Sequence, residues 1–297
     1  MERREVEYFL AVAEHGSFTG AAKALHVAQP SLSAAIGQLE NRLGGKLFHR
    51  LPHGVRLTPA GEALLEPGRQ VMRDLTTAQD SVRQVLGLTS GRLDIVAQTT
   101  LAIDPLAGLI GKFLHHHPQV DVRVVDQESG KSLTGIVRAG ECELGMVDSG
   151  TDPEGMDGIR LPGREIYAVL PPGHRTAKRI GLSELAALDF VTTPEGTATR
   201  GVIDDVVAAR DLRPRVSVET VHLAMVVPLV LAGAGVTLLP ESMAAGAARE
   251  GATVLPLRPK VVRAGRLFWR PGPLSPAASR FVDFAMDSAK PKNRRAR

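Results

Sequence analysis

The sequence predicts a mixed α/β protein in three parts, and three observations predict it. The first 58 of the 297 residues carry short helical stripes of apolar residues, then two extended runs around a Pro/Gly turn. Residues 59–88 carry a longer helical pattern with apolar residues at spacings of four and three. From residue 89 onwards short apolar strands alternate with helices, which is typical of sheets covered by crossover helices.

Residues 17–43 predict two helices with a tight break between them. Ser17 can cap the first helix, and Pro30 suits the first turn of the second, where the N–H it lacks would have no partner. The apolar stripe of the second helix consists of Leu32, Ile36, Leu39 and Leu43. A preceding helix can close a three-helix core with Val6, Phe9, Leu10 and Ala13, which face Phe18, Ala21, Ala22 and Leu25 of the first helix.

The opposite face of the second helix is small, uncharged and able to hydrogen-bond. Its residues are Gln29, Ser31, Ser33, Ala34, Gly37 and Gln38. A helix that enters the DNA major groove needs short side chains there and an amide, such as that of Gln29, that can pair with adenine. An ordinary helical hairpin with a polar face is the alternative.

A β-wing is predicted directly after these helices. Residues 46–50 and 55–58 form two short strands around a Pro/Gly turn, with Arg50, His53 and Arg56 near its tip. Cationic side chains on a wing suit contacts to phosphates or to the minor groove, which position a protein on DNA without reading much sequence.

The run from Phe9 to Leu65 resembles the winged helix-turn-helix of LysR-type transcriptional regulators. The elements AxxLHVxQPSLS and LTPAGEALL occur together at that family's spacing. The resemblance implies a helix-turn-helix over about 18–37, and family members often carry an arginine where this chain has Ala34. The DNA-binding residues expected are Gln29, Pro30, Ser31, Ser33, Ala34, Gln38, Arg50, His53 and Arg56.

The linker, residues 59–88, is expected to be one long helix capped by Thr58. Its apolar seam consists of Val71, Leu75, Ala78, Val82 and Val85. A lone helix with such a seam predicts dimerisation, with packing on its own domain as the alternative. Pro67 and Gly68 lie inside the pattern and are expected to kink or break the helix.

Residues 89–297 are expected to form one two-lobed α/β regulatory domain. Strands near 93–97, 120–124 and 144–147, separated by helices, predict a parallel sheet in lobe I, residues 89–161. A second such unit, lobe II, covers 162–266, and the chain returns to lobe I over 267–289 before a basic tail, 290–297. The family resemblance extends here through RLDIVAQTT and LVLAGAGVTLLPESMA, and implies the shape of a type 2 periplasmic-binding protein.

Ligands of parallel sheets bind at the carboxyl ends of strands, so an effector is expected between the two lobes. The residues expected there are Thr99, Thr100, Gln127, Asp148, Ser149, Thr193, Thr197 and His222. Hydroxyls and helix N-termini suit a small carboxylate or another oxygen-rich ligand, whereas Asp148 and Glu128 favour an amine or a mixed polar ligand. The threonines could also serve only as helix caps.

Several features count against other functions. No phosphate loop, zinc signature or nucleophile elbow occurs, so no enzyme activity, metal or cofactor is expected. The run His115–His117 cannot converge on one ion, because consecutive helical side chains diverge by about 100°. Cys142 is the single cysteine, which excludes a disulfide within the chain.

Composition places the protein in the cytoplasm. Apolar residues make up 43% of the chain, but no run approaches a membrane span, and the N-terminus lacks a signal peptide. The net charge of +4 is exceeded by the five basic residues of the tail alone, so net charge is weak support for DNA binding.

These observations predict a homo-oligomeric, sequence-specific transcription regulator that senses a small molecule of unknown identity. The expected partners are double-stranded DNA, a second copy of the chain and RNA polymerase, and the resemblance implies tetramers built from two dimers. The alternatives are a regulator that needs no ligand, or a cytoplasmic binding protein or enzyme whose N-terminal part serves only for dimerisation.

Overall fold

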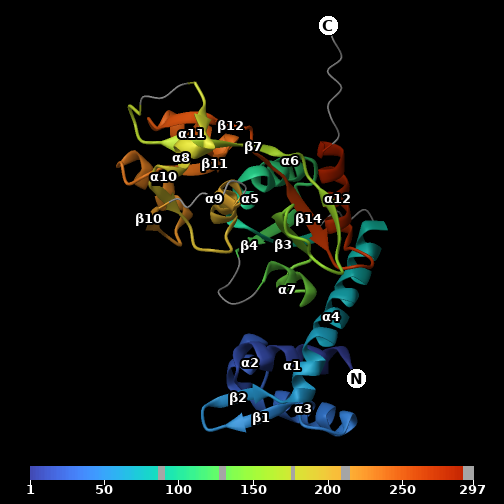
Figure 1. Ribbon diagram of the computed structural model, residues 1–297. Coiled ribbons are helices and arrows are strands. Elements are labelled where there is room, and N and C mark those ends of the chain that lie inside the picture. Colours follow the sequence, from blue (N-terminus) through green and yellow to red (C-terminus); the bar gives the residue numbers. More distant parts are fainter. Residues whose placement is uncertain (86–90, 127–131, 175–177, 209–214, 290–297) are drawn as a thin grey trace.

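The computed structural model describes residues 1–85, 91–126, 132–174, 178–208 and 215–289 (Figure 1). A helical head lies at one end of the molecule, and the long helix α4 leads from it to two α/β lobes. Lobe I lies against the far end of α4, and lobe II lies beyond lobe I. The α/β architecture with an N-terminal winged head is therefore the predicted one. Among the described residues, no helix is both long and apolar enough to span a bilayer.

The head is a three-helix core with a two-stranded wing. Its elements are α1 (Arg3–His15), α2 (Phe18–Ala24), α3 (Gln29–Leu43), β1 (Phe48–Leu51) and β2 (Gly54–Leu57). Both expected N-terminal signals of α2 and α3 are present, since Ser17 Oγ accepts from Gly20 N at 3.3 Å and Pro30 lies in the first turn of α3. The stripes bury Phe9, Ala21, Leu32, Ile36 and Leu39, but Leu43, expected in the stripe, is exposed at the last residue of α3.

The wing is fastened to the helices by aromatic and polar contacts. The ring of Phe48 packs on Phe9 at 5.4 Å and on Phe18 at 5.8 Å. Buried Glu40, near the end of α3, accepts hydrogen bonds from Leu47 N at 2.9 Å and Lys46 Nζ at 2.7 Å. These contacts fix the direction of the wing relative to α3.

Helix α4 (Pro59–Val85) continues through Pro67 and Gly68, so of the predicted kink or break the break does not occur. A proline inside a helix leaves one carbonyl of the preceding turn without its partner, a local loss that the packed helix tolerates here. Thr58 caps the helix as expected, because its Oγ1 accepts from Gly61 N at 3.1 Å. Gly68 lets α1 approach closely, since a Cβ there would lie 3.3 Å from Val6 Cγ1.

Lobe I is a five-stranded mixed sheet in the order β4-β3-β5-β14-β6. Its strands are β3 (Gly91–Ala97), β4 (Val120–Val125), β5 (Leu144–Asp148), β6 (Asp157–Arg160) and β14 (Gly265–Trp269). Its helices are α5 (Thr99–Leu101), the turn η1 (Ala102–Leu106), α6 (Ala107–His116), α7 (Leu133–Arg138) and α12 (Pro276–Ala289). The three predicted strands pair in parallel as expected, and β14 and β6 add an antiparallel edge.

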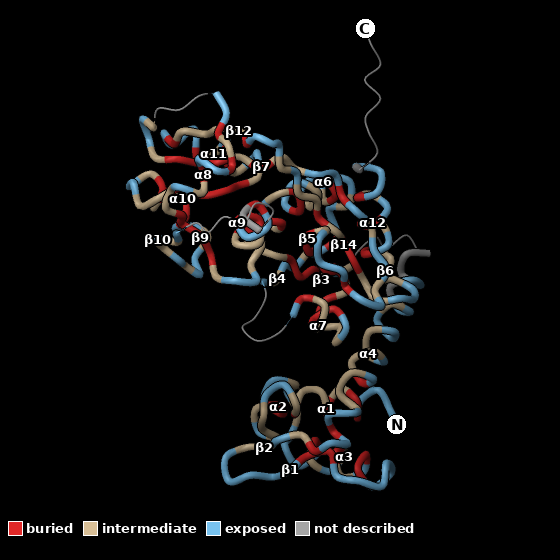
Figure 2. Tube along the Cα trace, viewed as in Figure 1, coloured by how far each residue is buried: buried red, intermediate tan, exposed pale blue. Residues whose placement is uncertain are grey.

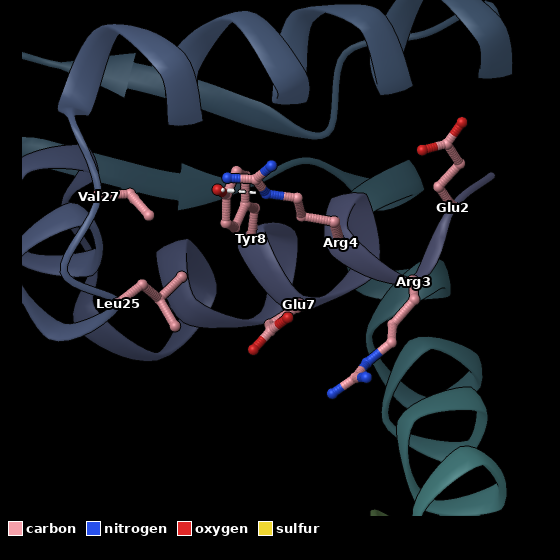
Figure 3. Close-up of a pocket in the computed structure, with 7 residues that line it drawn as sticks. All are labelled: Glu2, Arg3, Arg4, Glu7, Tyr8, Leu25 and Val27. Carbon is pink, nitrogen blue, oxygen red and sulfur yellow. Dashed lines mark hydrogen bonds between the residues drawn. The ribbon is translucent and has the colours of Figure 1, made fainter.

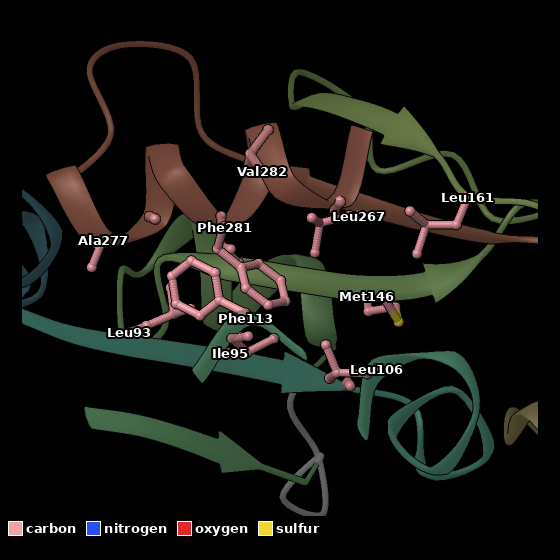
Figure 4. Close-up of a cluster of buried hydrophobic side chains, with 14 of the residues drawn as sticks. Leu93, Ile95, Leu106, Phe113, Met146, Leu161, Leu267, Ala277, Phe281 and Val282 are labelled. Carbon is pink, nitrogen blue, oxygen red and sulfur yellow. The ribbon is translucent and has the colours of Figure 1, made fainter. Parts of the chain in front are cut away.

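The side chains of this sheet alternate between two helical layers. One face packs on α6 and α12, where the rings of Phe113 and Phe281 meet edge to face at 5.2 Å (Figure 4). The other face packs on α7, so neighbours such as Leu267 and Phe268 point into opposite layers. Buried residues follow the sheet strands, whereas the middle of α4 has none (Figure 2).

Lobe II is also layered, but its sheet is not the parallel one expected. Its strands are β7 (Arg164–Leu170), β8 (Ile180–Gly181), β9 (Phe190–Thr192), β10 (Val216–Glu219), β11 (Thr237–Pro240), β12 (Thr253–Arg258) and β13 (Val262–Arg263). Its helices are α8 (Leu182–Ala186), α9 (Ala198–Ala208), α10 (Leu223–Leu231) and α11 (Glu241–Arg249). Central β7 runs antiparallel to β11 and β12, while β9–β10 and β12–β8 are parallel. Alternation alone cannot distinguish these directions, because side chains have a period of two in both.

The two lobes are joined by two crossing segments that lie side by side. The chain leaves lobe I between β6 and β7 and returns between β13 and β14. Backbone bonds tie the segments together, with Leu161 N donating to Gly265 O at 2.8 Å and β13 pairing with β7. Because β14 begins at Gly265, the return to lobe I falls two residues before the expected position, 267.

Gly61→Ala should destabilise the head, because the added Cβ would lie 2.2 Å from Leu47 O. Overpacking against a backbone atom costs roughly 1–3 kcal/mol, which exceeds the helix propensity gained. Gly37→Ala in α3 is the matched control, since nothing lies within 4 Å of its added Cβ. The midpoint of urea unfolding should therefore fall for Gly61→Ala and rise for Gly37→Ala. Equal shifts of the two midpoints would contradict the packing of α4 on the wing.

Candidate DNA interface and effector cleft

The small-residue face of α3 is open to solvent at the start of the helix. Gln29, Pro30, Ser31, Ala34 and Gln38 are exposed, and Ser33 is half-buried. Because the buried residues of α3 face α1 and α2, this face points away from the head's core. Short side chains there let a helix backbone approach base edges closely.

The wing brings its basic residues beside α3, although not all at its tip. Only His53 lies in the turn, while Arg50 and Arg56 lie within β1 and β2. Arg50 is already engaged, since its Nη2 donates to Ser33 Oγ at 3.3 Å and its guanidinium lies 5.1 Å from the centre of the Phe18 ring. Arg50 therefore connects the wing to both helices, a contact that the sequence did not indicate.

One side of α4 carries the predicted apolar seam, and the chain itself covers it only in part. Val71 is 36% exposed, Leu75 37% and Val82 60%, and Ala78 is exposed as well. The side chain of Val85 lies outside the described residues. Packing on the same chain, the alternative considered above, therefore leaves apolar surface of this seam open, most of all at Val82.

A different side of α4, which the sequence did not single out, binds lobe I. Arg69 forms an ion pair with Glu141 at 3.3 Å, and Arg73 Nη1 donates to Ala139 O at 3.0 Å. Gln70 Oε1 accepts from both Arg73, at 2.7 Å, and Arg270, at 2.6 Å. Burial, together with the neighbouring charge of Arg270, lowers the pKa of Arg73 to about 10. Only the tertiary structure shows that these polar residues face another domain and not solvent.

A cleft of about 370 Å³ opens between the lobes at the carboxyl ends of β3, β4 and β9. Its lining alternates hydroxyls, backbone turns and two carboxylates. The residues are Gln98, Thr99, Thr100, Asp126, Thr193, Pro194, Glu195, Gly196, Thr197, Ala198, Thr199, Val221 and Leu223. The cleft is therefore polar in most of its wall, with an apolar rim from Val221 and Leu223 on lobe II.

Four of the eight predicted effector residues line this cleft, two from each lobe. They are Thr99, Thr100, Thr193 and Thr197. Asp148 lies deeper, in a narrow inner compartment of about 30 Å³. Ser149 and His222 do not line either space, and Gln127 lies outside the described residues.

The threonines are also partly occupied by local bonds. Thr193 Oγ1 and Thr197 Oγ1 lie 2.5 Å apart, and Thr197 Oγ1 donates to Pro194 O at 2.7 Å. Thr197 also accepts from Arg200 N at 3.5 Å, at the start of α9. Thr197 therefore caps α9, as the alternative interpretation of the threonines expected. A hydroxyl that caps a helix can still accept one further hydrogen bond.

Many of the residues that line the cleft were not predicted from the sequence. Gln98 and Asp126 each end a strand next to a predicted residue, so the strand-end rule could have included them. Thr199, Val221 and Leu223 face the cleft only because of how α9 and α10 begin, and no sequence signal marks that orientation.

A second, larger hollow lies on the head, on the flank of α1 (Figure 3). It has a volume of about 510 Å³ and is lined by Glu2, Arg3, Arg4, Glu7, Tyr8, Leu25 and Val27. Its central polar groups are already paired, since Arg4 Nε donates to Tyr8 Oη at 2.7 Å. None of its lining residues belongs to the lobes or to the predicted DNA-binding set.

The remaining polar residues singled out by the sequence lie in ordinary surroundings. His115 and His116 are exposed, whereas His117 is half-buried and packs on Phe113 with ring centres 4.6 Å apart. Burial and the charge of Arg280 lower the pKa of His117. Cys142 is buried, which raises the pKa of its thiol to about 12. The part of the chain that the structure describes contains no group of three or more potential metal ligands.

Two family models match the chain and together span nearly all of it. Residues 3–62 match the model described as bacterial regulatory helix-turn-helix protein, lysR family. Residues 86–290 match the model described as LysR substrate binding domain. Their boundary falls in the region of α4 that joins the head to the lobes.

Curated relatives and solved structures agree with these matches. The transcriptional dual regulator GltC of Bacillus subtilis is 33% identical over 96% of this chain and 97% of its own length. The transcriptional activator protein LysR of Escherichia coli is 28% identical over 84% of this chain and 81% of its own length. A full-length OxyR variant from Pseudomonas aeruginosa shares the fold with a TM-score of 0.74, at 24% identity over 96% of this chain and 94% of that one. CbnR in complex with its target DNA shares it with a TM-score of 0.68, at 24% identity over 97% and 100% of the two chains.

Gly140→Ala should loosen α4 from lobe I, because the added Cβ would lie 1.6 Å from Arg73 Nη1. Gly155→Ala is the matched control, since both glycines have a positive φ, +68° and +71°, but nothing lies within 4 Å of residue 155. Both variants pay the left-handed strain of roughly 1–2 kcal/mol. The melting temperature should fall further for Gly140→Ala than for Gly155→Ala. Equal decreases would show that Arg73 does not pack against residue 140.

Proposed function

This chain belongs to the LysR family of transcriptional regulators, and on that basis we propose a function for each of its parts. Helix α3 and the wing bind one half-site of a specific DNA duplex. Helix α4 pairs two chains, and a small polar molecule held between the lobes changes the spacing of the heads. The relatives are regulators and not enzymes, which supports the same assignment here.

The open, small-residue face of α3 is the observation that carries the DNA-binding part. Gln29 lies at the N-terminal end of the helix, where recognition helices place the side chains that contact base edges. Ser31, Ser33, Ala34 and Gln38 extend the same face, so the backbone can approach the groove floor. His53 and Arg56 on the wing are assigned to backbone or minor-groove contact, and Arg50 to holding the wing against α3.

The exposed seam of α4 supports a homodimer through this helix. An apolar stripe of Val71, Leu75, Ala78 and Val82 gains stability only when another surface covers it. A two-fold dimer places two heads on half-sites separated by a helical turn or a multiple of one. Tetramers formed from two such dimers, contact with RNA polymerase and a cytoplasmic location complete the proposal.

The cleft supports a small, oxygen-rich or amine-bearing effector. Hydroxyls of Thr99, Thr100 and Thr193 can bind either kind, while the Asp126 and Glu195 carboxylates at the wall favour a ligand that also carries donors. A regulator without any ligand is the second candidate, and it would be favoured by a cleft filled with side chains. The 370 Å³ that remain open favour the effector.

Selection of bound duplexes from a random DNA pool tests the DNA-binding part. The wild type should enrich a partly palindromic motif, and Gln29→Ala should relax preference at one base position, a cost of about 1–3 kcal/mol for a bidentate contact. Arg56→Ala should instead weaken binding to all sequences and reduce the salt dependence by about one phosphate. No enrichment by the wild type would contradict the assignment of α3, and the enriched duplex then serves as the probe in a metabolite screen.

Val82→Asp should dissociate the dimer, because it places a charge in the middle of the exposed seam. Thr76→Asp is the control, since this exposed residue lies on α4 away from the seam and introduces the same charge. Sedimentation of both variants gives the comparison. A dimer that survives Val82→Asp would place the interface elsewhere.

A further inference from the structure

Two arginines face each other on the strands that join the lobes. Arg164 begins β7 and Arg263 ends β13, and the pairing of these strands sets the two residues directly opposite one another. Like charges at opposite positions of an antiparallel pair are destabilising unless other groups neutralise them. Each arginine does meet an aspartate of lobe I.

Arg263 contacts carboxylates from both lobes. Its Nε donates to Asp148 Oδ2 at 2.7 Å, at the carboxyl end of β5 in lobe I. Its Nη1 donates to Asp205, which lies on α9 in lobe II. The side chains of Arg263 and Asp148 are only 19% and 10% exposed, so solvent screens this pair little, whereas Asp205 is 69% exposed.

A second set of contacts also joins the two lobes. Asp104, in the turn η1 of lobe I, forms an ion pair with Arg164 at 3.1 Å. Its other oxygen accepts from Ser242 Oγ at 2.5 Å, and Ser242 lies on α11 in lobe II. The group that contacts both lobes is therefore Arg263 in the first set and Asp104 in the second.

The contacts of Arg263 adjoin the effector cleft on the lobe I side, at Asp148, and on the lobe II side, at the helix that carries Asp205. Gln98, in the wall of the cleft, accepts from Asp148 N at 2.9 Å, and the first turn of α9 contributes Ala198 and Thr199 to the same wall. Four of the five charged residues line the compartment of about 30 Å³, namely Asp104, Asp148, Arg164 and Arg263. This compartment shares Thr100, Ala198 and Thr199 with the outer cleft. A molecule seated in the cleft therefore touches the groups that position Asp148 and Asp205.

We propose that Arg263 and Asp104 form a latch that holds the lobes together in the protein without effector. They are positioning residues for the effector response. The part of the effector in this inference rests on the function proposed above, but the latch itself does not. An effector that rearranges Gln98 or the start of α9 shifts the balance between latched and separated lobes, because it binds the two states with different affinity.

The latch can be measured without an effector, from the distance between spin labels on the two lobes. Lys112→Cys on α6 and Ala248→Cys on α11 supply exposed labelling sites in lobe I and lobe II. The native Cys142 is buried with its pKa raised to about 12, so it does not compete for the label. The full chain is used, diluted with unlabelled subunits so that only distances within one chain are recorded.

Asp205→Asn should lengthen and broaden this distance distribution, with a several-fold rise in the separated population, on the scale of a single partly exposed ion pair. Arg263→Gln removes the contacts to both Asp148 and Asp205 and should produce the larger change. The matched control is Asp204→Asn, the neighbour of Asp205 on α9, whose partner Arg200 belongs to the same lobe. Its distribution should equal that of the wild type.

Unchanged distributions in Asp205→Asn and Arg263→Gln would overturn the latch. Circular dichroism identifies loss of fold, and if Arg263→Gln fails to fold, Asp205→Asn decides alone, since that residue is exposed. A metabolite screen that finds no effector would contradict the proposed function and leave these distances as they are. The two failures are therefore distinguishable.

Discussion

The crossing of the chain between its two lobes is the constraint on which the rest depends. The chain passes from lobe I to lobe II and back through segments that hydrogen-bond to each other, at Leu161–Gly265 and along β7–β13. Two short paired segments permit the lobes to change their separation without unfolding either sheet. The narrow compartment and the charged contacts of Arg164 and Arg263 lie at this crossing, and the compartment adjoins the cleft through Thr100, Ala198 and Thr199.

Helix α4 carries different chemistry on its different sides, and this division connects the lobes to the head. The apolar seam is partly exposed, while Arg69, Gln70 and Arg73 hold lobe I. Since α4 also packs on α1 through Gly68, the head and lobe I are fastened to the same rigid element. A change between the lobes can then reach the head through α4.

The head was the part most predictable from sequence, because its signals are local. The cap at Ser17, the proline at the start of α3 and the apolar stripes each act within a few residues, and all are present. Leu43 is exposed and α4 does not break at Pro67, because the position of a helix end and the tolerance of a proline depend on packing. Half of the predicted cleft residues line it, since strand ends place Thr99 and Thr193 but do not orient Ser149 or His222.

The sequence by itself determined the class of protein, the order of its parts and the polar face of α3, because periodicity and capping are properties of neighbouring residues. Only the tertiary structure decided the antiparallel pairing of β7 and the contact of Arg73 with lobe I. It also decided that Asp148 binds Arg263 and does not line the open cleft. Each of these joins residues far apart in the chain, and which of them meet depends on how complete sheets and helices pack. A one-dimensional pattern contains no record of that packing.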